Sequence, residues 1–218
     1  MPSGKARTSH QSEMPESATG ILIICDLDRV AINCEERFAQ AEREHKKGTP
    51  EYWRAALDPK KFHLDQPLAE AIEHLEVLVT GAHLCYLTSR PGDCYEATVA
   101  FLRQYGYPCP EQTICRPVRK RLTTPRYKSL AVRALAYGIS HGLIHRHFWL
   151  ATSAPLFFLC SWWSQRKRAN TTIIFIDDNE RNRQTVAASG LNIMLAANLV
   201  EARTLKEGVW KKQDNKVQ

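Results

Sequence analysis

The sequence has no Cys-x-x-Cys spacing, no internal repeat and no coiled-coil heptad pattern. Because its seven cysteines stand singly, it offers no zinc site of the common structural type, and nothing suggests assembly through a coiled coil. The first 20 residues also lack the apolar block of a secretory signal peptide, so we expect a disordered leader over residues 1–20. Single cysteines inside apolar stretches, as at Cys25 and Cys85, favour a reducing cytoplasm.

The composition indicates one globular domain and a negatively charged partner. The chain has 218 residues, of which 44% are hydrophobic, enough for one α/β domain with a small attachment. Its formal charge of +7 favours a phosphorylated small molecule or a nucleic acid as partner or substrate. The alternative is that much of the excess charge comes from exposed tails.

One apolar stretch ends in two acids. Ile21–Ile24 and Cys25 form an apolar run typical of a strand buried on both faces of a parallel sheet. Asp26 and Asp28 follow at its carboxyl end, where open α/β sheets bind ligands. Residues separated by one position on an extended chain point the same way. We therefore expect a pocket for a divalent cation or a proton-transfer pair.

Three further stretches carry polar residues of the same kind. A second apolar strand over 83–87 ends at Thr88 and Ser89, before a predicted helix that would offer free N–H groups to an anion. Lys128 stands at the head of a helical pattern. A further apolar strand over 171–176 ends in Asp177 and Asp178.

These four stretches, in this order, resemble the motifs of the haloacid dehalogenase superfamily. The resemblance implies a Rossmann-like α/β fold, with a parallel sheet flanked by helices and a minimal cap after the first strand. The cap is expected within the helical pattern over 33–57, where Thr49 and Pro50 resemble a helix N-cap and first helical residue. We expect the catalytic domain to span residues 21–200 and residues 201–218 to form a polar, frayed tail.

The resemblance also implies a reaction, the hydrolysis of a phosphomonoester. Asp26 would be the nucleophile and would form an aspartyl-phosphate intermediate. Asp28 would protonate the leaving oxygen and then deprotonate the attacking water. Thr88 and Lys128 would hold the phosphoryl oxygens.

The cofactor implied by the resemblance is Mg²⁺, which prefers hard oxygen ligands. Its ligands would be the Asp26 carboxylate, the Asp28 backbone carbonyl and Asp177, with Asp178 in support. A binding role for substrate is expected for Ser89, Arg90, Arg29 and Arg116.

Two local features bear on the substrate. The stretch 87–93, Leu-Thr-Ser-Arg-Pro-Gly-Asp, is similar to the phosphatase domain of polynucleotide kinases and to related small acid phosphatases. This likeness favours a nucleotide or nucleic-acid 3′-phosphate. Arg29 departs from the family pattern, which usually has glycine there, so it could narrow the entrance, bind phosphate or weaken activity.

Residues 138–170 form an apolar insertion that the resemblance does not explain. Its run over 148–163, roughly sixteen residues, is shorter than the ~20 needed to cross a bilayer. A single crossing would also separate Asp177 from Asp26. Three interpretations stay open: an interfacial membrane hairpin, a partner-binding patch, or a segment that is not native coding sequence.

Two other functions compete with the phosphatase. The chain could be a catalytically weak binding protein that uses the insertion to engage a partner or a membrane surface. It could also be a defective product whose insertion prevents folding, and deletion of residues 139–169 should then raise the soluble yield. Four acids at the ends of buried strands favour the enzyme, since a binding module has no need of them.

Overall fold

The computed structural model describes residues 20–117, 123–140 and 171–214. At its centre lies a five-stranded sheet in the order β5-β4-β1-β6-β7, in which every neighbouring pair of strands is parallel. The strands are β1 (Ile21–Cys25), β4 (His83–Pro91), β5 (Thr113–Arg116), β6 (Thr172–Ile176) and β7 (Ile193–Ala196). The predicted Rossmann-like α/β fold is confirmed.

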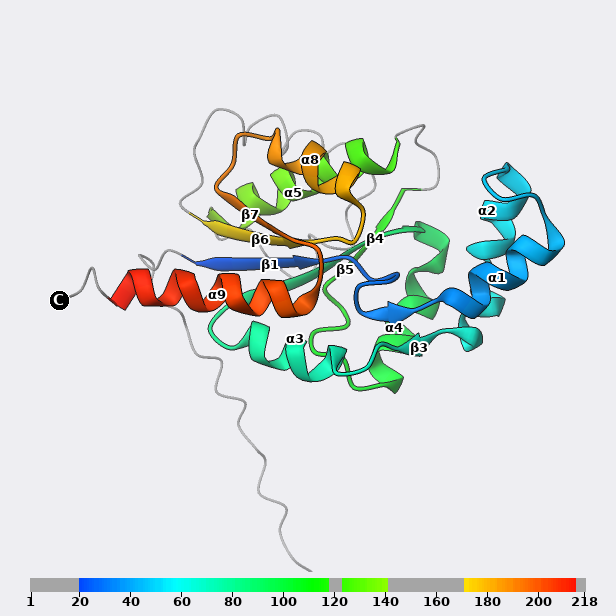
Figure 1. Ribbon diagram of the computed structural model, residues 1–218, viewed down its shortest axis with the longest axis horizontal. Helices are drawn as coiled ribbons and strands as arrows, with labels where there is room; N and C mark the ends of the chain where they lie inside the picture. Colours follow the sequence, from blue (N-terminus) through cyan, green and yellow to red (C-terminus); the bar gives the residue numbers. More distant parts are fainter. Residues whose placement is uncertain (1–19, 118–122, 141–170, 215–218) are drawn as a thin grey trace, which may run out of the picture.

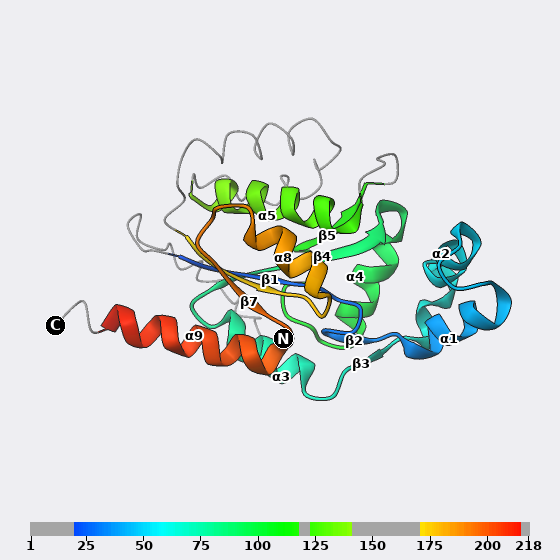
Figure 2. The ribbon, with the colours of Figure 1, turned by 45° about the horizontal axis from the view of Figure 1, so that its top comes forward.

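The central strand β1 is buried along its whole length because helices cover both faces of the sheet. Side chains at 21, 23 and 25 pack into one hydrophobic cluster, and those at 22 and 24 pack into another. The first cluster includes residues of α3 (Ala71–Val79), α4 (Tyr95–Gln104) and α9 (Leu199–Asp214). The second includes residues of α5 (Thr124–Ser140) and α8 (Glu180–Ala187). Figures 1 and 2 show α5 and α8 together on one side of the sheet.

The segment between β1 and α3 forms a small cap. Its elements are α1 (Glu35–Glu44), α2 (Pro50–Ala56), the 3₁₀ helix η1 (Pro59–Leu64) and the antiparallel pair β2 (Ile32–Asn33) and β3 (Gln66–Pro67). Figures 1 and 2 place α1 and α2 beyond the end of β1 that carries the acids. The predicted N-cap is confirmed, since the Tyr52 amide donates to Thr49 Oγ1 at 3.3 Å and Pro50 begins α2.

The last helix corrects the expectation of a frayed tail from residue 201. Helix α9 continues to Asp214 and packs against α3 and the sheet. Its buried Lys206 donates to the carbonyl oxygens of Val77 and Thr80, at 2.8 and 2.7 Å. These carbonyls lie at the carboxyl end of α3, where a cation is favourable, so Lys206 fastens α9 to α3.

Several predictions fall on residues that are not described: the leader over 1–19, the basic residues 118–121 and the insertion over 141–170, including the run 148–163. Within the described segments, no helix is both long enough and apolar enough to cross a membrane.

Candidate active site

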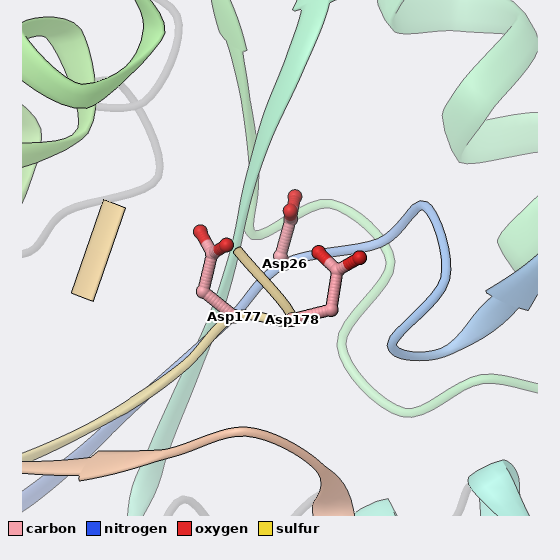
Figure 3. A group of neighbouring side chains, drawn as sticks. All are labelled: Asp26, Asp177 and Asp178. Carbon is pink, nitrogen blue, oxygen red and sulfur yellow. The ribbon is translucent and has the colours of Figure 1, made fainter. Parts of the chain in front are cut away.

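Three acids meet where β1 and β6 end. Asp26 follows β1, and Asp177 and Asp178 follow β6, its direct neighbour in the sheet. One carboxylate oxygen from each lies within 4.8 Å of those of the other two, and Figure 3 shows the three side chains grouped together. The predicted convergence of Asp26 with the acids of the last motif is therefore observed. The Asp28 side chain is not part of this group.

Lys128 neutralises part of this acidic group. Its Nζ lies 2.6 Å from an oxygen of Asp26 and 2.6 Å from an oxygen of Asp177, and the lysine is almost fully buried. Burial alone would lower the pKa of Lys128, but the charges of the two acids outweigh burial and raise it. For Asp26, burial dominates and raises the pKa to about 7, although Lys128 opposes the shift. One ammonium group therefore stands beside three carboxylates, so the acidic group keeps an excess of negative charge.

The donor set fits a magnesium ion. Carboxylates from Asp26, Asp177 and Asp178 supply hard oxygen ligands around a single point. Asn182, in α8, donates through Nδ2 to both oxygens of Asp177, at 3.0 and 3.1 Å. Its buried Oδ1 has no hydrogen-bond partner among the described residues. An unsatisfied buried oxygen beside surplus carboxylates is a feature that a cation, or water bound to one, would satisfy.

Asp28 belongs to a second, separate ion cluster. One of its oxygens lies 2.6 Å from Nη2 of Arg37 in α1 and 2.6 Å from Nη2 of Arg90 at the end of β4. The same arginines bind Asp65, with Nε of Arg37 at 2.7 Å and Nη2 of Arg90 at 2.8 Å. Phe62 covers both guanidinium groups, at 5.0 Å from Arg37 and 4.2 Å from Arg90. Two acids therefore balance two bases in a buried group that joins the cap to the sheet.

This second cluster affects the role predicted for Asp28. Burial would raise the pKa of Asp28, but the charges of Arg90 and Arg37 outweigh burial and hold the pKa well below its usual range. An ionised carboxylate can accept a proton from water and cannot donate one. The two arginines thus favour the proton-accepting half of the predicted role and oppose the donating half.

Arg90 does not lie where sequence reasoning placed it. Its side chain is fully buried and engaged by Asp28, Asp65 and Thr98, and it does not line the cavity described below. Its predicted contact with substrate does not fit this arrangement, because Asp28 lines the cavity while the Arg90 guanidinium binds Asp28 from the buried side. Arg90 is instead a residue that positions Asp28.

Thr88 and Ser89 lie inside β4 rather than at a helix N-terminus. The strand is irregular after Leu87 but continues to Pro91, and the first helical turn, η2 (Gly92–Cys94), begins only afterwards. Thr88 is fully buried, and its Oγ1 accepts a hydrogen bond from the Arg90 amide at 3.2 Å. The predicted helix does follow, but the prediction that Thr88 and Ser89 lie at its N-terminus is wrong. Ser89 does line the cavity.

An open cavity of about 650 Å³ lies between the acids and the cap. Asp26, Asp28, Asp178 and Lys128 line it together with Ser89. Four further cations also line it: Arg29, Lys47, Arg116 and Arg181. The predicted placement of Arg29 and Arg116 at the site is consistent with this lining. The cavity therefore combines an acidic base, suited to a metal, with cations suited to a phosphorylated ligand.

Arg29 stands in a conformation that glycine adopts more easily. Its φ angle is 67°, in the left-handed region where a side chain is disfavoured by about 1–2 kcal/mol. The turn is held by the Arg29 amide, which donates to the Ile32 carbonyl at 2.8 Å. This geometry explains physically why glycine would suit the position.

Sequence reasoning missed Arg37 and Asp65. Arg37 precedes the buried Ala41 by four residues and so shares its face of α1, which places an arginine on an apolar stripe. Such an arginine signals a buried acidic partner, although the sequence does not say which. Asp65 ends a 3₁₀ turn in the cap and carried no comparable signal.

Comparisons with known proteins gave only distant likenesses. A scan of protein families and a search of curated proteins found no match to this sequence. Among solved structures, a class C acid phosphatase from Bacillus anthracis is 20% identical, with a TM-score of 0.39, covering 48% of this chain and 44% of that one.

Two other solved structures cover more of the chain. A haloacid dehalogenase-like hydrolase from Streptococcus pneumoniae is 10% identical with a TM-score of 0.46, covering 86% of this chain and 98% of its own. A HAD-superfamily hydrolase of subfamily IA from Geobacter sulfurreducens is 13% identical with a TM-score of 0.42, covering 88% and 97%. At these identities and TM-scores the three likenesses establish neither a family nor an activity.

Proposed function

We propose that this protein is a magnesium-dependent phosphomonoesterase of the haloacid dehalogenase type. The observation that carries the proposal is the group formed by Asp26, Asp177 and Asp178 around Lys128, at the carboxyl edge of a parallel sheet and open to a cavity. A structural ion cluster would be neutral and sealed. This group has more acids than bases and faces a space large enough for a ligand.

Asp26 and Asp28 have different roles in the proposed reaction. An oxygen of Asp26 attacks phosphorus, the bond from phosphorus to the leaving oxygen breaks, and an aspartyl-phosphate remains. The leaving oxygen takes its proton from water, because Arg37 and Arg90 keep Asp28 ionised. A second water then attacks phosphorus and gives a proton to Asp28, the bond from phosphorus to Asp26 breaks, and inorganic phosphate and free Asp26 result.

The positive groups of the site supply the electrostatic part of catalysis. Lys128 holds Asp26 in place and offers its ammonium to the phosphoryl oxygens. Magnesium, held by Asp26, Asp177 and Asp178 with the Asp28 carbonyl, would cancel the repulsion between the nucleophile and the phosphate dianion. Asn182 orients Asp177.

For the substrate we propose a nucleotide or a nucleic-acid end with a 3′-phosphate. The support is the excess of cations over acids in the cavity lining, together with the net charge of +7.

The proposed setting is a reducing cytoplasm, because all six cysteines of the described residues are free thiols.

The test measures phosphate release from p-nitrophenyl phosphate and from a 3′-phosphorylated oligonucleotide, with magnesium and with chelator. A 5′-phosphorylated oligonucleotide is the matched control substrate. We expect magnesium-dependent turnover that Asp26→Asn abolishes, with the 3′-phosphate preferred. Absence of turnover from protein that is folded by circular dichroism would overturn the proposal.

A further inference from the structure

The cap wall of the cavity is aromatic. Phe38 of α1 and Tyr52 and Trp53 of α2 all line the cavity, and their rings contact one another with centroids 4.9–6.4 Å apart. Tyr52 is buried and fixes the arrangement, whereas Trp53 is 47% exposed. The cap thus holds a large indole in a set position beside the cavity, at the cost of exposed apolar surface.

Cations stand next to these rings. The Arg29 guanidinium lies 5.2 Å from the centre of the Phe38 ring, and Lys47 lies on the same cap. No salt bridge joins Arg29 to an acid anywhere in the described segments, and its side chain is exposed. Lys47 has only a surface pair with Glu42. Positive charge at this end of the cavity is therefore free to meet a ligand.

The cavity is too large for a phosphate group alone. Its volume of about 650 Å³ falls within the ~300–1,000 Å³ typical of cavities that hold whole small molecules. A ligand whose phosphate lies at Asp26 would extend along the remaining space toward the cap. The chemistry that it meets there is an aromatic face flanked by cations, which suits a flat, electron-rich ring joined to anionic groups.

We infer that Trp53, supported by Tyr52 and Phe38, forms a base-binding subsite that selects phosphomonoesters whose leaving group is a nucleoside. The inference rests on the proposed phosphatase function and names what the cap recognises. The nucleobase stacks on Trp53, while Arg29 and Lys47 contact a neighbouring phosphate if the substrate has one. Trp53 is a specificity-determining residue and takes no part in the chemical step.

The first experiment compares two substrates that differ only in the base. One is a 3′-phosphorylated dinucleotide, and the other is the same molecule lacking the base of its 3′-terminal nucleotide. Base stacking on an aromatic side chain changes affinity by about tenfold to hundredfold. Trp53→Ala should reduce kcat/KM for the complete dinucleotide by that factor and change kcat/KM for the abasic one less than about twofold. Trp53→Phe, which keeps a ring, should recover part of the loss.

A control variant tests whether the expected loss of kcat/KM is specific to Trp53 or follows from changing any partly exposed tryptophan. Trp210 is also partly exposed but lies on α9, beside Lys206. Trp210→Phe should leave kcat/KM for both dinucleotides unchanged. An equal loss for the two dinucleotides in Trp53→Ala, or no loss for either, would overturn the subsite.

The second experiment separates the subsite from the proposed reaction. The Asp26→Asn chain, which cannot form the phosphoenzyme, is titrated calorimetrically with the complete dinucleotide, with and without Trp53→Ala. Binding that weakens tenfold or more without Trp53 supports the subsite even if the native chain releases no phosphate. If the native chain does release phosphate but the base affects neither binding nor turnover, the subsite is wrong and the phosphatase stands.

Discussion

The two ion clusters of this protein use the same chemical groups for different purposes. Around Lys128, three acids share one base and face an open cavity. Around Asp28, two acids share two arginines, and three of the four side chains are fully buried. The first cluster has negative charge to spare, whereas the second is balanced.

The difference shows how to separate a candidate metal site from a structural ion pair. Counting acids alone would place Asp28 with Asp26, since the two are separated by one residue. Counting the bases within contact separates them, because a carboxylate that already binds two guanidinium groups has little left for a cation. The balanced cluster instead ties α1 and the end of η1 to the sheet.

Breaking the balanced cluster should have the largest effect on stability. Arg37→Met keeps most of the side-chain volume but leaves Asp28 and Asp65 short of a partner in a buried place. We expect a loss of about 3–5 kcal/mol in the free energy of unfolding, because one charge of a buried group becomes uncompensated. Urea denaturation followed by circular dichroism measures it.

The same helix provides the control. Arg43 pairs with Glu36 at 2.8 Å, but both side chains are mostly exposed. Arg43→Met should therefore cost less than about 1 kcal/mol. If the two variants lost equal stability, the cluster around Asp28 would not hold the cap to the sheet.

Removing the base from the unbalanced cluster should act mainly on catalysis. Lys128→Met should lower kcat about 10²- to 10³-fold, because the ammonium group is lost from the position where phosphoryl charge develops. Steady-state release of p-nitrophenol reports the effect. Arg126→Met, an exposed position two residues earlier on α5, is the control and should stay within about twofold of native. A Lys128→Met enzyme with near-native kcat would remove Lys128 from the mechanism.

The sequence predicted the first cluster better than the second, because the two clusters differ in how far apart their residues lie along the chain. Asp26, Asp177 and Lys128 each follow a strong local pattern, a buried strand or a helix start, and parallel strands bring such ends together without further information. The two arginines that bind Asp28 are 9 and 62 residues away, on elements whose packing only the folded chain determines.

The error over the carboxyl-terminal segment has a similar cause. Polar and basic residues dominate α9, and its apolar stripe is narrow: Leu199, Ala202, Leu205 and Val209. Their spacing of three or four residues is helical. The stripe packs on α3 and the sheet, and that tertiary contact, rather than local composition, orders the segment.

Adding magnesium should distinguish the clusters directly. At a concentration near 100 times its Kd, a ligand that binds only the folded state adds about 2.7 kcal/mol to the free energy of unfolding. We expect a shift of this size in thermal denaturation of the native chain and a much smaller one in Asp178→Asn. Asp65→Asn, in the balanced cluster, should lower the melting temperature yet keep the magnesium shift. A shift lost equally in both variants would contradict the separation of the clusters.

The smallest expected effect concerns Arg29, which directly follows Asp28 in the chain and lines the cavity. Arg29→Gly and Arg29→Ala both remove the guanidinium and its contact with Phe38, so they differ only in how the backbone tolerates a φ angle of 67°. Glycine adopts that conformation freely, and we expect Arg29→Gly to be more stable than Arg29→Ala by roughly 1 kcal/mol in urea denaturation.

The same pair of variants reports what the guanidinium does for the substrate. An equal rise in KM for the 3′-phosphorylated dinucleotide in both variants would assign the effect to the lost cation. Both variants lack the guanidinium, whereas the backbone strain at position 29 differs between them. A rise confined to Arg29→Gly would assign it to a loosened turn after Asp28. If glycine proved no more stable than alanine, the left-handed turn at position 29 would not be strained.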